Sequence, residues 1–87
     1  MAWPAFAGRD IDQDEALRLV EQGELLPLQQ ILDDALGRYP GRLLEVELEF
    51  EDGRYIYEIE LVTQDKRVIE LEYDGQTGRL LEIDEED

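Results

Sequence analysis

The sequence predicts an α+β domain. Two N-terminal helices are expected to pack on one face of a four-stranded antiparallel meander sheet, whose other face is acidic and solvent-exposed. Apolar residues recur with helical spacing in the first half of the chain and at alternate positions in the second. Helical segments that precede strands are typical of this class, and short connections favour antiparallel neighbours. The 87 residues are enough for one domain.

The first half of the chain carries two helix signals. Asp12 followed by Glu15 has the spacing of a capping box, and Gly23 is expected to end this first helix. Pro27 suits the first turn of a second helix, which a proline-glycine pair at 40–41 ends. The apolar residues of the second helix follow the i, i+3, i+4, i+7, i+8 rule. They are Leu28, Ile31, Leu32, Ala35 and Leu36.

Four strands are expected in the second half, at about 43–51, 54–63, 67–73 and 79–84. Asp52-Gly53 is a two-residue hairpin signal. A turn there places Leu48 opposite Tyr57, and every apolar residue of the hairpin then faces the core. A polar turn at 64–66 and the turn DGQTG at 74–78 separate the remaining strands.

The same register gathers glutamates into two rows on the opposite face. The first row is Glu45, Glu60 and Glu70, and the second is Glu47, Glu58, Glu72 and Glu82. Two like charges about 5 Å apart in water repel by roughly 1 kcal/mol, whereas burial of one large apolar side chain contributes about 1.5–3 kcal/mol. The core therefore outweighs the repulsion. Because the helices offer few basic residues, this face is expected to stay open to solvent.

Crowding of these carboxylates predicts that their pKa values rise in the folded state. Repulsion then lowers stability above those pKa values and is relieved on protonation. Mild acid or added salt is therefore expected to raise the melting temperature.

The composition argues against most catalytic sites. The chain contains no His, Cys, Ser or Asn and only one Lys, so Ser-His, Cys-His and zinc-water mechanisms cannot be assembled. We expect no enzymatic activity and no cofactor. The net charge of −16 argues against nucleic acid and anionic membranes and favours cationic partners. No apolar run approaches the roughly 18 residues of a membrane span.

One N-terminal motif resembles part of a calcium-binding loop. Asp10, Asp12, Asp14 and Glu21 match EF-hand positions 1, 3, 5 and 12, but Glu15 occupies the sixth position, which needs glycine. We interpret these acids as a helix cap favoured by the helix dipole, and we expect no metal site there.

The glutamate face is the candidate functional site. Its members are Glu45, Glu47, Glu49, Glu58, Glu60, Glu70, Glu72 and Glu82. Three interpretations remain open: a solvated surface that keeps the domain soluble, a surface for a basic protein partner, and a loose divalent-cation surface. Trp3 and Phe6 are a further candidate anchor for a partner.

Residues 1–10 are expected to be a flexible N-terminus, residues 11–84 the domain, and residues 85–87 an acidic tail. Ala5-Phe6-Ala7 has the small-x-small spacing that signal peptidase accepts, although the charged and long apolar parts of a signal are missing. The segment is either a trimmed export signal or an ordinary N-terminus.

The chain resembles the PepSY domain family. A Pro-Gly pair, strands with alternating glutamates and an Asp-x-x-Thr-Gly turn follow one another in that family's order. The matching segments are Tyr39-Pro40-Gly41, Val46-Glu47-Leu48-Glu49, Gly53, Tyr57-Glu58-Ile59-Glu60, Glu70-Leu71-Glu72-Tyr73-Asp74 and Thr77-Gly78-Arg79-Leu80-Leu81. Upstream, DIDQDEALRLVEQG looks like the family's opening helix, which extends the resemblance to about residues 10–83. The helix at 27–38 then is an insertion relative to the shortest members.

The resemblance implies an exported, periplasmic bacterial protein that binds rather than catalyses. PepSY domains occur in propeptides of thermolysin-type metallopeptidases, where they are thought to restrain the protease, and as free-standing periplasmic or membrane-tethered modules. We expect a regulatory module, such as a peptidase inhibitor or an accessory protein of an envelope sensor. The alternatives are a divalent-cation-binding protein and a structural domain that dimerises through a sheet edge.

Overall fold

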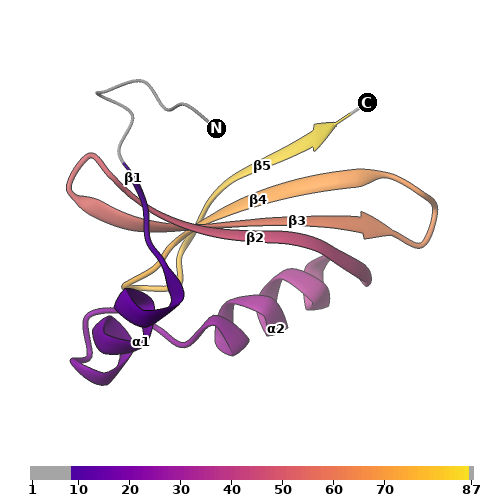
Figure 1. The fold of residues 1–87 in the computed structure, drawn as a ribbon. Helices are drawn as coiled ribbons and strands as arrows, with labels where there is room; N and C mark the ends of the chain where they lie inside the picture. The colour runs from indigo at the N-terminus through magenta and orange to yellow at the C-terminus, as the bar shows by residue number, and fades with distance from the viewer. Residues whose placement is uncertain (1–8, 87) are drawn as a thin grey trace.

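The structure, a computed structural model, describes residues 9–86 and shows an α+β fold. Its elements are β1 (Arg9–Asp10), α1 (Gln13–Glu21), α2 (Leu28–Arg38), β2 (Gly41–Glu51), β3 (Arg54–Thr63), β4 (Val68–Asp74) and β5 (Leu80–Glu86). Both helices lie on the same side of the sheet (Figure 1). The predicted fold class, the two helices and the four-stranded meander are therefore confirmed.

The sheet gains a fifth, very short strand at its N-terminal edge. The strand order is β1-β2-β3-β4-β5, and every neighbouring pair is antiparallel. Residues 9 and 10, expected in a flexible segment, pair with Phe50 and Glu49. Ile11 follows them into the core, and its backbone N–H donates to the Leu48 carbonyl oxygen at 2.7 Å. Residues 1–8 and 87 lie outside the described residues, as do the expectations for Trp3, Phe6 and the signal remnant.

Both helices begin where the sequence predicts. The Asp12 side chain accepts a hydrogen bond from the Glu15 backbone N–H at 2.9 Å, and α1 starts one residue after this cap. Of the EF-hand-like acids, Asp10 thus belongs to β1, Asp12 and Asp14 to the start of α1, and Glu21 to its last position. Pro27 precedes α2, which buries Ile31 and Ala35 against the sheet.

The β2–β3 hairpin has the predicted register. Asp52 and Gly53 both have positive φ angles, 52° and 80°, as a two-residue turn of type I′ requires. The cross-strand pairs are Phe50↔Tyr55, Leu48↔Tyr57 and Val46↔Ile59. The next strands pair Leu61 with Ile69 and Leu71 with Ile83, so the apolar positions stay in phase across β2 to β5.

Two tyrosine hydroxyls connect the core sheet to the helical layer. Tyr73, fully buried on β4, donates to Asp34 Oδ2 on α2 at 2.6 Å. Tyr57 on β3 donates to the Leu26 carbonyl oxygen just before α2 at 2.8 Å. These bonds satisfy the polar ends of two large core side chains and fix the helix position over the sheet.

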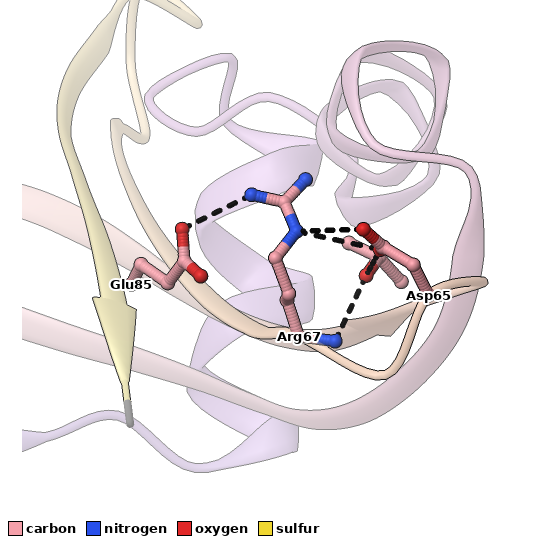
Figure 2. A network of polar contacts seen from close by, with 4 residues as sticks. Asp65, Arg67 and Glu85 are labelled. Carbon is pink, nitrogen blue, oxygen red and sulfur yellow. Dashed lines mark hydrogen bonds and ion pairs between the residues drawn. The ribbon is translucent and has the colours of Figure 1, made fainter.

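The outermost strand, β5, is largely exposed. Ile83, on its helix-facing side, keeps 44 % of its surface exposed, and Leu81 keeps 37 %. Arg67 links this strand to the β3–β4 turn through ion pairs to Glu85 at 3.0 Å and Asp65 at 3.1 Å (Figure 2). The helices therefore cover the middle of the sheet better than this edge.

Candidate functional site

Carboxylates lie side by side on the sheet face that points away from the helices. One line of cross-strand neighbours is Glu45, Glu60, Glu70 and Asp84, and the next is Glu47, Glu58, Glu72 and Glu82. We call these eight residues together with Glu49 the acidic sheet face. The register of both predicted rows is confirmed, and Asp84 is an additional member that the sequence analysis did not include.

Glu49 corrects the expectation that all of these carboxylates are exposed to solvent. Only 3 % of its surface is exposed, and Ile56, directly opposite on β3, is 6 % exposed. On the other side of β2, Asp10 of β1 pairs with Glu49. Glu49 thus has a strand on each side of it and an apolar neighbour. The residue in the sequence that could have predicted the burial of Glu49 was Ile56, an apolar residue at a position expected to face outward.

Partial burial raises the pKa of several glutamates on this face. Desolvation is the largest cause for each of them, followed for most by repulsion from neighbouring carboxylates. They are Glu49, Glu58, Glu60, Glu70 and Glu72. The effect is greatest at Glu58, where burial and the charges of Glu49 and Glu70 raise the pKa to about 8. The Glu58 carboxyl therefore holds a proton for much of the time at neutral pH.

The carboxyl pair Glu49 and Glu58 is tightly linked. Burial raises the pKa of Glu49, and the charges of Glu47, Glu51 and Asp10 add to this effect. A hydrogen bond with Glu58 acts in the opposite direction and lowers the Glu49 pKa. The second oxygen of Glu49, Oε2, is buried and has no hydrogen-bond partner.

The geometry of these carboxylates permits the binding of a cation or a proton. Oxygen atoms of Glu47, Glu49 and Glu58 lie within 4.8 Å of one another, as do those of Glu60, Glu70 and Glu86. The hollow beside them has a volume of about 20 Å³, room for a single water or ion. Its lining consists of Glu45, Glu47, Glu58, Glu60 and Glu70.

The basic residues that form ion pairs in the described part of the chain do so away from the acidic sheet face. Ion pairs join Arg38 to Asp34, Arg54 to Asp74, and Arg67 to Asp65 and Glu85. None of the ion pairs between described side chains involves the acidic sheet face.

A basic end of the molecule was not expected from the sequence. Two surface pockets of about 380 and 340 Å³ lie beside the β3–β4 turn and the C-terminal end of α2. Their linings include four of the eight basic residues of the chain: Arg38, Arg42, Lys66 and Arg67. The adjacent Lys66 and Arg67 can be seen in the sequence as a basic pair. Only folding brings Arg38 and Arg42 to the same end of the molecule.

The fold and this face define a small α+β domain with its helices on one side of a sheet and its carboxylates on the other. The family model described as peptidase propeptide and YPEB domain, PepSY, matches residues 25–84. This match covers most of the chain, and the chain belongs to the PepSY family. The matched segment includes α2, which was predicted to be an insertion, and does not include α1, which was predicted to be the family's opening helix.

No curated protein and no solved structure matches the chain significantly. The PepSY family is extracytoplasmic, and its domains are generally regulatory or inhibitory modules that mediate protein interactions. Within residues 9–86, neither helix has the length and apolar character needed to cross a membrane.

Proposed function

We propose that this protein is an extracytoplasmic, non-catalytic binding module whose acidic sheet face docks a basic surface of a protein partner. Family membership supports a role in protein interaction. The observation that carries the proposal is the continuous array of carboxylates across β2, β3, β4 and β5. A chain without His, Cys or Ser favours binding over catalysis.

Electrostatic repulsion within the free domain would favour such a partner. Cross-strand neighbours of Glu58, Glu70 and Glu72 are themselves acidic, and desolvation together with these like charges raises the pKa of all three carboxyls. Lys or Arg side chains of a partner would replace this repulsion with attraction. The net charge of −16 would also accelerate the encounter with a basic surface at low salt.

The partner that we propose is a peptidase of the thermolysin type, which the domain would inhibit. The family description, which names peptidase propeptides, supports this choice. The test is inhibition of a purified thermolysin-type peptidase by the full chain, measured as an inhibition constant with a peptide substrate. We expect inhibition that weakens as salt is raised.

Two double variants locate the contact. Glu60→Gln/Glu70→Gln removes two charges from the acidic sheet face, and Glu21→Gln/Glu24→Gln removes two exposed charges from α1 and the segment after it. We expect the first to weaken inhibition by about tenfold, equivalent to about 1.4 kcal/mol, and the second to leave it unchanged. Equal losses would exclude the acidic sheet face as the contact, and absence of inhibition by the wild type would exclude this partner.

A further inference from the structure

We propose that the acidic sheet face contains a specific site for one calcium ion, formed by Glu47 and Glu49 of β2 and Glu58 of β3. This inference requires no protein partner and stands or falls separately from the function proposed above. We call these three residues the β2–β3 carboxylate triad.

The sheet brings the triad together from two adjacent strands. Glu47 and Glu49 are two residues apart on β2 and therefore point to the same face. Glu58 lies directly opposite Glu47. One oxygen from each carboxylate lies within 4.8 Å of the others. Calcium–oxygen bonds are about 2.3–2.6 Å long, so two oxygens bound to one calcium ion can be up to about 5 Å apart. A single ion can therefore contact all three carboxylates.

Glu49 supplies the independent observation that points to a ligand. Its side chain is more than nine-tenths buried, with 3 % of the residue surface exposed, and its Oε2 atom has no hydrogen-bond partner. A buried carboxylate oxygen without a partner is costly. A cation within the triad would be the missing partner.

No cation from the described side chains fills this role. The described ion pair that lies closest to the triad in sequence joins Arg54 to Asp74 at 3.7 Å. It lies at the end of the sheet where the β2–β3 hairpin turns. The 20 Å³ hollow lined by Glu47 and Glu58 adjoins the triad and is large enough for one water ligand of the ion. Three carboxylates can offer up to six oxygens, which is the lower limit of the six to eight that calcium takes.

The donor set favours calcium over other divalent ions. All ligands are carboxylate oxygens, and the chain has no His or Cys to attract zinc or copper. Magnesium needs near-ideal octahedral geometry, keeps several water ligands and is usually bound by one or two carboxylates, whereas calcium accepts several carboxylates in a flexible arrangement. We expect an affinity on the order of 10⁻⁴ M, the range of extracellular calcium modules.

Calorimetric titration of the full chain with calcium chloride at fixed salt, after removal of metals with a chelator, tests the proposal. We expect one saturable site and a melting temperature that rises by several degrees when calcium exceeds the dissociation constant about tenfold. Magnesium at the same concentration should give a clearly smaller rise. Absence of saturable binding, or equal rises with both ions, would overturn the proposal.

Single variants distinguish a specific site from general attraction to the acidic sheet face. Glu49→Gln and Glu58→Gln should weaken calcium binding by about tenfold or more. Glu86→Gln removes one charge from the other carboxylate cluster, in which Glu86 is exposed, and should change the affinity by less than about twofold. Equal weakening in all three variants would indicate diffuse attraction and overturn the proposal.

A measurement on the wild type covers the case in which a variant fails to fold. Carboxyl carbon chemical shifts of Glu47, Glu49 and Glu58 should move together and saturate during the calcium titration. Shifts spread evenly over the glutamates of the acidic sheet face would contradict the site.

Discussion

At the scale of single residues, acids on the two sides of the sheet have opposite environments. Asp34, on the helical side, accepts hydrogen bonds from the Tyr73 hydroxyl and from Arg38 Nε at 2.6 and 2.7 Å, and both contacts lower its pKa. On the acidic sheet face, burial and neighbouring carboxylates raise the pKa of Glu58 to about 8. Ionisation of Asp34 therefore stabilises the fold, whereas ionisation of Glu58 destabilises it.

Replacement of Tyr73 by Phe tests the contribution of the Tyr73–Asp34 hydrogen bond. The ring remains in the core, but the bond to a charged acceptor is lost, and we expect the free energy of unfolding to fall by about 1–2 kcal/mol. Urea denaturation with an unchanged m-value would measure this loss. Tyr39→Phe, at the partly buried end of α2, should change stability by less than about 0.5 kcal/mol. Similar losses in both variants would show that the Asp34 contact contributes nothing.

Replacement of Glu58 by Gln should stabilise the domain at alkaline pH and have little effect in acid. The pKa of Glu58 is about 8 in the folded protein and about 4.5 in the unfolded chain. The cost of its charge is thus fully present above pH 8 and absent below pH 4.5. Melting temperatures at about pH 9 and pH 5 would measure the difference, with Glu24→Gln as an exposed control. A Glu58→Gln variant that is less stable than wild type at pH 9 would contradict the repulsion described here.

At the scale of secondary-structure elements, the strand register could be predicted because two local signals agreed. Asp52 and Gly53 fix a two-residue turn, and the alternating apolar residues on either side permit only one phase. Strand β1 could not be predicted, since two residues show no periodicity and their pairing with Phe50 and Glu49 is a long-range contact. The same contact explains why the burial of Glu49 was missed.

The start of β2 gives a second test at this scale. A Cβ atom on Gly41 would lie 2.0 Å from the Val62 carbonyl oxygen and 2.9 Å from its carbon, both backbone atoms that cannot easily move. Gly41→Ala should therefore destabilise the domain by about 2 kcal/mol or more. Gly37→Ala, in α2, meets no atom within 4 Å and should stabilise it by about 0.5–1 kcal/mol. Thermal unfolding of the two variants would reveal the opposite signs, and a tolerated Gly41→Ala would argue against this close strand contact.

At the scale of the whole molecule, the acidic composition sets the dependence of stability on pH. Glu58, whose pKa is raised to about 8, and Glu72, whose pKa is also raised, destabilise the fold less as falling pH protonates them. The lowered pKa values of Asp34, Asp65 and Asp74 have the opposite effect, because their stabilising charges are lost in stronger acid. The two groups together predict maximal stability in mild acid.

Melting temperatures measured from pH 9 to pH 3 would test this prediction. We expect the melting temperature to rise as pH falls towards about 5 and to decline below about pH 4. Added sodium chloride should raise the melting temperature more at pH 8 than at pH 5. Salt screens the repulsion between charged carboxylates, and fewer of them are charged at pH 5. A melting temperature that falls steadily from pH 8 to pH 5 would be inconsistent with repulsion on the acidic sheet face.

Strand β5 ends the described sheet, and its outer backbone groups face no further strand. Open strand edges of this kind are templates for fibril growth. If a second copy added antiparallel through its own β5, Glu82, Asp84 and Glu86 would meet a strand that carries the same three charges, and like charges facing each other oppose pairing. The β5 strand of a second copy is therefore poorly suited to extend the sheet at this edge. We expect the domain to resist ordered self-aggregation through β5 even when it is concentrated.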